Sequence, residues 1–199
     1  MFDIEAIILW LGQNPEWIMY GLCLAAFVES FAIIGIIVPG VALLAAISVL
    51  AASTNLPIFQ LVLFVYVSGC FADISSFFLG KYLGRRIDHV WPFKKNPTWL
   101  EQGRKFFKTY GIAGVFLGRF IGPVRPLIPI TAGSLNMDLR TFITVDLVSG
   151  LLWAPLYTLP FYYFGKTAFE GSGTLSLATA LTALAVAFLF LARYLVSKK

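Results

Sequence analysis

Histidine and cysteine are scarce in this chain. Its 199 residues include one histidine, His89, in a polar stretch, and two cysteines, Cys23 and Cys70, far apart in apolar stretches. One histidine cannot supply a histidine-rich metal site or a two-histidine phosphatase centre. The sequence also contains no Gly-x-Ser-x-Gly element, which argues against a serine hydrolase. We therefore expect no metal, no cofactor and no enzyme activity, and we expect both cysteines to be reduced and structural.

Charged residues are few as well. They make up 13% of the chain, whereas 59% of its residues are hydrophobic. A soluble domain has about 25% charged and roughly 45–50% apolar residues. Five apolar stretches reach the roughly 20 residues that cross a bilayer core. These stretches are residues 18–52, 56–80, 111–135, 142–165 and 175–195. The sequence thus predicts one membrane domain over residues 1–199.

Lysine and arginine gather in one connecting segment. Eight of them lie between residues 81 and 108, against two acidic residues, and three more lie near the C-terminus. Because such residues favour cytoplasmic loops, both regions are expected in the cytoplasm and the acidic N-terminus outside. Residues 1–17 are expected to form a helix at the membrane surface. Residues 85–109 are expected to be a cytoplasmic amphipathic segment, with a helix over 97–111 in which Trp99, Phe106 and Phe107 face lipid. We interpret the basic cluster as a topology signal that contacts anionic lipid, not as a nucleic-acid site.

The charge distribution also predicts the path of the chain. Residues 56–84, 140–165 and 174–196 are expected to cross the membrane once each. Residues 18–52 would extend about 52 Å as one helix, too long for a single crossing. Residues 110–135 must begin and end on the cytoplasmic side, so both segments are expected to be re-entrant hairpins. The expected helix breaks are Pro39 and Gly40 in the first hairpin and Pro123, Pro126 and Pro129 in the second.

Short matches relate the two halves of the chain. Residues 28–40 match residues 118–130, an alignment that sets Glu29 against Arg119 and Pro39 against Pro129. Two shorter matches follow in the same order. They are Val-Ser-Gly at 67–69 with 148–150, and Phe-Phe-Leu-Gly-Lys at 77–81 with Tyr-Tyr-Phe-Gly-Lys at 162–166. Since the two halves have opposite orientations, the matches indicate an inverted repeat. The predicted fold is an all-α polytopic membrane protein in which a re-entrant hairpin and a transmembrane helix repeat, followed by a C-terminal transmembrane helix.

Arg119 and Arg125 lie in the second expected hairpin. An arginine at the bilayer centre costs about 2.5–3.5 kcal/mol on insertion scales, so such residues are usually functional. Proline also frees backbone carbonyls, which only a protein-lined, wet cavity can satisfy at that depth. The planar guanidinium suits phosphate, so both arginines are candidate substrate-binding residues. The alternative is that both side chains extend to the cytoplasmic headgroups.

Glu29 lies in the first expected hairpin and Asp73 in the span 56–84, so both acids are expected well inside the membrane. A carboxylate that changes protonation at such depth is a candidate proton carrier, so both are candidates for proton coupling. The alternative for Glu29 is a static ion pair with Arg119 or Arg125 that ties the hairpins together. We interpret Asp146 as a helix N-terminal carboxylate and Trp153 as an interfacial anchor.

Three stretches resemble the DedA family of bacterial inner-membrane proteins, also called the SNARE-associated or VTT-domain family. They are FVESFAIIGIIVPG, GCFADISSFFLGKYLGR and FLGRFIGPVRPLIPITAGSLNM, and the most specific part is the motif from Arg119 to Arg125. The resemblance implies a multi-pass translocase for phosphate-bearing lipids, such as phospholipids or undecaprenyl phosphate, a polyprenyl carrier. It implies that Glu29, Asp73, Arg119 and Arg125 are functional and that protons participate.

One position departs from this family. Members often carry an acidic residue after the Pro-Gly of the first hairpin, where this chain has Val41. The departure leaves open an active flippase or a passive scramblase. Two other functions stay open, a proton-coupled exporter of small cations or drugs and a non-transporting membrane assembly protein. Lipid identity, direction of transport and formation of a homo-oligomer are not determined by the sequence.

Overall fold

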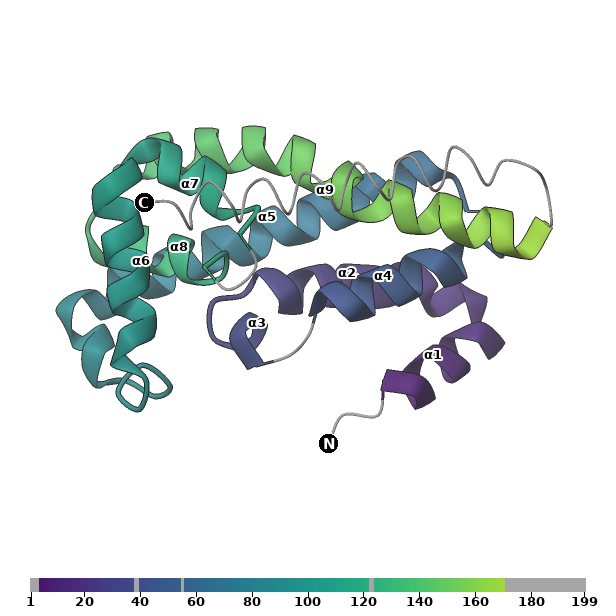
Figure 1. Ribbon diagram of the computed structural model, residues 1–199, viewed down its shortest axis with the longest axis horizontal. Helices are drawn as coiled ribbons and strands as arrows, with labels where there is room; N and C mark the ends of the chain where they lie inside the picture. Colours follow the sequence, from purple (N-terminus) through teal and green to yellow (C-terminus); the bar gives the residue numbers. More distant parts are fainter. Residues whose placement is uncertain (1–3, 38–39, 55, 122–123, 171–199) are drawn as a thin grey trace. The chain divides into compact units, whose positions relative to one another are not determined.

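The computed structural model describes residues 4–37, 40–54, 56–121 and 124–170. Pro39, Pro123 and the expected span 174–196 lie outside these residues. The described elements are α1 (Ile4–Gln13), η1 (Pro15–Trp17), α2 (Ile18–Ser30), α3 (Ile34–Ile37), α4 (Gly40–Ala51), α5 (Ile58–Leu83), η2 (Gly84–His89), α6 (Pro97–Tyr110), α7 (Ile112–Gly118), α8 (Leu127–Ser134) and α9 (Leu139–Glu170). Figure 1 shows these helices, and the all-helical fold class is confirmed for the described part of the chain.

Two helices are long and apolar enough to cross a membrane. They are α5, over Ile58–Leu83, and α9, over residues Leu139–Lys166. The 26 residues of α5 extend about 39 Å at 1.5 Å per residue, more than the roughly 30 Å of bilayer hydrocarbon. Both helices lie where the sequence predicts spans, at 56–84 and 140–165.

The two segments expected to be hairpins are broken into shorter helices. In the first, α2 ends at Ser30 and three non-helical residues separate it from α3, so this break precedes the expected one. Gly40 begins α4. In the second, α7 ends at Gly118 and Pro126 caps the start of α8.

Pro129 does not break a helix. It is the third residue of α8, where the backbone N–H of any residue would have no partner within the helix. A proline is therefore tolerated there without kinking the helix. The prediction of a break at Pro129 is wrong, and the break of this segment lies before Leu127.

The chain divides into two compact units, and several helices contribute to both. The first unit comprises residues 1–27, 39–68 and 154–199, and the second comprises residues 28–38 and 69–153. In the first unit, α1 packs on α4. The backbones of α4 and α9 also approach closely there, since a Cβ on Gly165 would lie 2.5 Å from the Val49 carbonyl oxygen.

The second unit is built around α5 and α8. A Cβ on Gly80 would lie 2.0 Å from the Ile130 carbonyl oxygen, so these two helices require glycine at their contact. Small residues allow such close packing of helix backbones. The amphipathic helix α6 packs on α7 and α8. Phe106 is therefore buried against protein, contrary to the expectation that it faces lipid.

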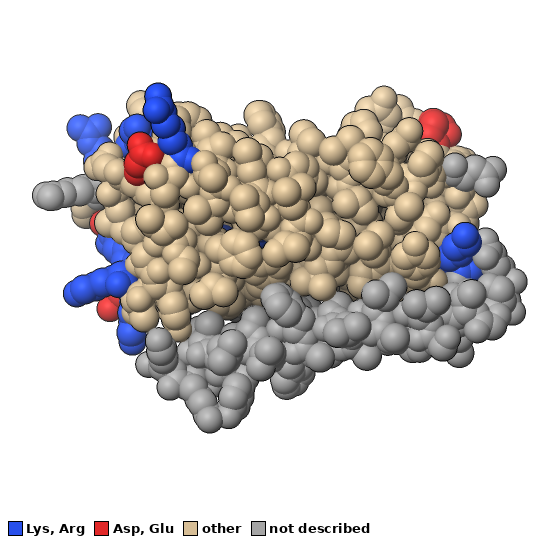
Figure 2. Space-filling view, turned by 90° about the horizontal axis from the view of Figure 1, so that it is seen from above, with Lys and Arg blue, Asp and Glu red and all other residues tan. Residues whose placement is uncertain are grey.

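Exposed charged side chains and exposed large apolar side chains lie on different parts of the second unit. Exposed lysines include Lys81, Lys94, Lys95, Lys105 and Lys108, and Figure 2 shows lysine and arginine gathered on the side where α6 lies in Figure 1. By contrast, Phe71 and Leu151, in α5 and α9, are more than 60% exposed. Large exposed apolar side chains on long helices are typical of a lipid-facing surface.

Asp138 stabilises the start of α9. The backbone N–H and the hydroxyl of Thr141 both donate to Asp138 Oδ2 at 2.9 Å, and these hydrogen bonds, the backbone one foremost, lower the pKa of the Asp138 carboxyl. A lowered pKa means that the stabilisation is present above the pKa of the unfolded state and is lost as the pH falls through the folded value. We expect Asp138→Ala to lower the Tm at neutral pH, and the difference to vanish in acid. Asp138→Asn, which keeps an acceptor, should retain most of the Tm without this pH dependence, as thermal unfolding at several pH values will show.

Candidate functional site

The connection between α7 and α8 carries both candidate arginines, and it lies wholly in the second unit. Arg119 and Arg125 are each 3% exposed. Their guanidinium groups therefore lie inside the protein, and the alternative in which they extend to the headgroups does not fit this structure. A buried cation is stable only when it is paired and hydrogen-bonded, so its partners define the site.

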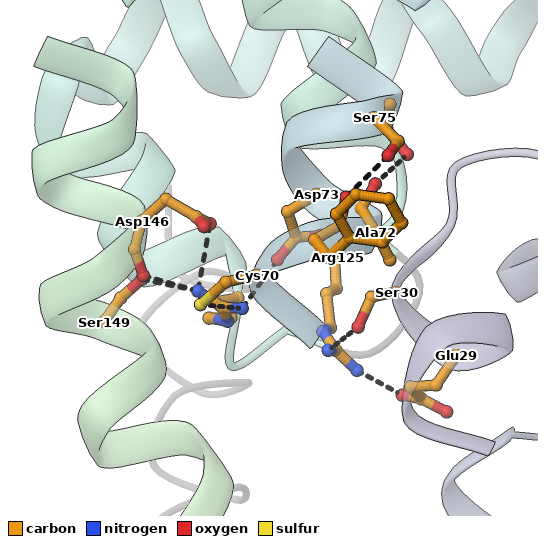
Figure 3. A network of polar contacts seen from close by, with 12 residues as sticks. Glu29, Ser30, Cys70, Ala72, Asp73, Ser75, Arg125, Asp146 and Ser149 are labelled. Carbon is orange, nitrogen blue, oxygen red and sulfur yellow. Dashed lines mark hydrogen bonds and ion pairs between the residues drawn. The ribbon is translucent and has the colours of Figure 1, made fainter. Parts of the chain in front are cut away.

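Arg119 is held by groups from α5 and α9. Its Nη2 lies 2.7 Å from Asp73 Oδ2, and its Nη1 lies 2.9 Å from Asp146 Oδ1. Nη1 also donates to the Asp146 carbonyl oxygen at 2.6 Å and to Ser149 Oγ at 3.2 Å. Nη2 lies 3.6 Å from Cys70 Sγ. Figure 3 labels these partners, Cys70 and Asp73 on α5 and Asp146 and Ser149 on α9.

Arg125 is held by the end of α2. Its Nη1 lies 2.8 Å from Glu29 Oε1, and its Nη2 donates to Ser30 Oγ. The guanidinium also lies over the indole of Trp153, with Cζ 3.9 Å from the ring centroid. The corresponding distance for Arg119 is 5.5 Å, so one buried tryptophan contacts both cations. Such cation–π contacts contribute about 2 kcal/mol or more when desolvated.

Local backbone features bring these side chains together. The backbone N–H of Ala32, just after α2, donates to Ser76 Oγ on α5 at 3.0 Å. This bond satisfies a backbone group that the helix break leaves without a partner and fixes Glu29 next to α5. Gly69 leaves room for the site, because a Cβ there would lie 3.0 Å from the Trp153 ring and 3.6 Å from Arg119 Nη2.

The four residues predicted to be functional are all found in this site. Arg119 pairs with Asp73, and Arg125 pairs with Glu29. The repeat alignment sets Glu29 opposite Arg119, but the contact that forms is with Arg125. The ion pair of Glu29 with Arg125 is thus part of the structure, as the alternative interpretation of Glu29 expects.

Asp146 and Trp153 belong to the site, although the sequence interpretation assigned both to structural roles at span ends. Asp146 lies seven residues into α9, about two turns, whereas the helix dipole favours carboxylates only within the first turn. Trp153 follows seven residues later, on the same helix face. It is 0% exposed, so it is not an interfacial anchor. Depth within the span was the signal that could have identified both residues.

The site encloses little free space. A cavity lined by Asp73, Val115, Arg119, Arg125, Ile128, Pro129 and Asp146 has room for about one water molecule. A lipid phosphate does not fit while the ion pairs are closed. Among the residues that the structure describes, no group of three or more histidine, cysteine, aspartate or glutamate side chains could hold a metal ion.

Comparisons with known proteins agree on one family. Residues 38–163 match the VTT domain. Inner membrane protein YabI of Escherichia coli is 34% identical over 152 residues, 76% of this chain and 59% of YabI. Inner membrane protein YqjA of the same species is 28% identical over 158 residues, 77% of this chain and 72% of YqjA. A membrane protein of Mycobacterium tuberculosis is 28% identical over 180 residues, 85% of this chain and 77% of that protein.

The chain spans about three fifths of the length of the first of these relatives. No solved structure matches it. The VTT-domain match covers more than half of the chain and includes α4 to α8, most of α9 and both arginines. The chain therefore belongs to the VTT-domain family of membrane proteins, also called the DedA family.

Proposed function

We propose that this protein moves phosphate-bearing lipids, such as phospholipids or undecaprenyl phosphate, between the leaflets of the bacterial inner membrane. The observation that carries the proposal is the pair of buried guanidinium groups, Arg119 and Arg125, at a helix break. Both are neutralised by carboxylates at 2.7–2.9 Å. Guanidinium binds carboxylate and phosphate through the same planar fork, so a lipid phosphate can replace a carboxylate without leaving the cation unpaired.

The closed ion pairs define what transport requires. Because the cavity holds about one water, the site must open before a headgroup enters. Protonation of Glu29 or Asp73 would remove the negative charge that competes with phosphate for the arginines. These two acids are therefore the proposed proton-coupling residues. A proton gradient would then favour replacement of a carboxylate by phosphate at the arginines on the side where the acids become protonated.

An inverted repeat of hairpin and span is the proposed framework for this movement. The matched sequences Phe-Phe-Leu-Gly-Lys and Tyr-Tyr-Phe-Gly-Lys end the two spans, and their glycines make similar contacts. Gly80 of α5 lies against Ile130 of α8 in the second unit, and Gly165 of α9 lies against Val49 of α4 in the first. Each span thus packs on the hairpin of the other repeat, as inverted repeats in transporters do around a shared site.

Reconstitution of the full-length protein in liposomes tests this function. We expect it to speed the exchange of labelled phospholipid or polyprenyl phosphate between leaflets relative to protein-free vesicles. An imposed pH gradient separates gradient-driven flipping from passive scrambling. Arg104→Gln is the matched control, because Arg104 forms an exposed ion pair with Asp88, with side chains 38% and 42% exposed. It should leave the rate unchanged. No acceleration with any phosphate lipid would contradict the proposal.

The alternatives predict different results. A proton-coupled exporter of small cations or drugs would move a labelled cation in the same vesicles, although two buried arginines repel a cation at this site. A non-transporting assembly protein would use the ion pairs only for stability. In that case Glu29→Ala would lower the amount of protein and leave any activity per molecule unchanged.

A further inference from the structure

The buried charges of the site do not balance. Glu29, Asp73 and Asp146 are three carboxyl groups, against the guanidinium groups of Arg119 and Arg125, and all five side chains are at most 9% exposed. If every group were ionised, the site would carry one uncompensated negative charge. An unpaired charge inside a protein costs several kcal/mol, and ionisable groups avoid this cost by becoming neutral.

The excess charge lies with Asp73 and Asp146. Glu29 has a cation at 2.8 Å in Arg125. Asp73 and Asp146 instead share one guanidinium, with Arg119 Nη2 at 2.7 Å from the first and Nη1 at 2.9 Å from the second. Two carboxylates held against one another in a low-dielectric site cannot both remain ionised.

Asp73, from α5, and Asp146, from α9, bind the two terminal nitrogens of the same guanidinium, so their carboxyl groups lie side by side at Arg119. An ionised carboxylate only accepts hydrogen bonds, so a hydrogen bond between the two groups needs a proton on one of them.

Unpartnered polar atoms point to the same place. Asp73 Oδ1 and Asp146 Oδ2 are buried without a hydrogen-bond partner, as is Arg119 Nε. Asp73, Asp146 and Arg119 line the cavity that has room for about one water. Buried polar atoms are normally hydrogen-bonded, and a proton held between the two carboxyl groups would give these oxygens a partner.

We propose that Asp73 and Asp146 form a proton-binding site in which the two carboxyl groups share one proton. Among the residues that the structure describes, the other charged or titratable groups around the pair are Arg119, Arg125, Glu29 and the thiol of Cys70. With one shared proton, the three acids carry two negative charges and balance the two arginines. The pair thus adds Asp146 to Glu29 and Asp73, the two acids already proposed for proton coupling.

One consequence rests on the proposed function. Uptake of a second proton by the pair neutralises the remaining carboxylate, and Arg119 is left with an unbalanced positive charge. A lipid phosphate can restore the balance by binding there. Release of that proton restores the carboxylate, which then competes with the phosphate for Arg119.

Infrared difference spectroscopy tests the shared proton without any transport. The full-length protein is measured in a detergent that has no ester groups, in H₂O and in D₂O, at neutral pH. We expect one protonated carboxyl band per chain that shifts in D₂O. The band should be lost in Asp146→Asn and in Asp73→Asn. It should be retained in the double variant Glu29→Gln with Arg125→Met, which removes one carboxyl and its cation together and leaves two acids on Arg119. A band that persists in Asp146→Asn, disappears in this double variant or is absent from the wild type would overturn the proposal.

The asparagine variants also test the site through stability. In Asp146→Asn the amide keeps the oxygen that accepts from Arg119, and its NH₂ group donates where the shared proton would lie. The variant should therefore fold with a Tm equal to or above that of the wild type at neutral pH. A clearly lower Tm for both Asp146→Asn and Asp73→Asn would count against the shared proton. If the band behaves as expected and the liposomes show no lipid exchange, the proton site stands and the proposed function fails.

Discussion

Replacing Arg119 with methionine is expected to lower the free energy of unfolding by about 3–5 kcal/mol, because breaking a buried ion pair leaves an uncompensated charge. Arg119 is 3% exposed and lies within 2.9 Å of carboxylate oxygens of Asp73 and Asp146. Methionine has no charge to offset the remaining carboxylate. Denaturant unfolding of the full-length protein in detergent measures the loss. Arg104→Met, at an exposed ion pair, should cost no more than about 1 kcal/mol.

A triple variant separates lost charge balance from lost packing. Arg119→Met combined with Asp73→Asn and Asp146→Asn removes the cation together with both carboxylates. Because replacing a whole buried ionic group by neutral residues is often close to neutral for stability, this variant should recover most of the loss. A triple variant as unstable as Arg119→Met alone would mean that packing around the guanidinium, and not charge, stabilises the site.

Replacing Arg125 with lysine is expected to slow lipid exchange about 10- to 150-fold, the equivalent of one lost hydrogen bond to a charged group at about 1.5–3 kcal/mol. Lysine keeps the positive charge that Glu29 needs, so the protein should still fold. It lacks the planar fork that reaches Glu29 and Ser30 through two nitrogens and would bind a phosphate with two parallel bonds. The rate of leaflet exchange in liposomes is the measurement.

Two controls accompany Arg125→Lys. Arg104→Lys, the same change at an exposed arginine, should leave the exchange rate unchanged. Thermal unfolding should show that Arg125→Lys is folded at the assay temperature. A folded Arg125→Lys protein that exchanges phosphate lipids at the wild-type rate would exclude the guanidinium fork as the phosphate-binding group.

The arginines and two of the three acids of the site were predictable because hydrocarbon makes buried charge rare. Glu29, Asp73, Arg119 and Arg125 interrupt apolar stretches, and the structure places all four in one cluster. The sequence interpretation places Asp146 at a helix start, because the sequence does not define the first residue of α9 to better than a few positions. The structure begins α9 at Leu139, which places Asp146 about two turns inside.

The acid pair shows a further limit of sequence reasoning. At the first hairpin, Val41 stands where the related family often has an acid. The structure brings a third acid to the site from α9 instead, where Asp146 lies beside Asp73 at Arg119. No spacing rule connects residues 73 and 146, because their proximity depends on how α5 and α9 pack.

The sequence alone determined that this is a helical membrane protein and where its two long described helices lie. It also determined which charged residues lie in apolar stretches, where an unpaired charge is so unfavourable that it needs partners. Those properties follow from local composition, since burial of apolar side chains and the cost of charge in hydrocarbon act on each segment separately. Only the tertiary structure decided the partners: Glu29 with Arg125, Asp73 and Asp146 with Arg119, and Trp153 against both cations. These contacts join residues far apart in the chain. They depend on how the helices pack, including their close approach at glycines, and not on the sequence near each residue.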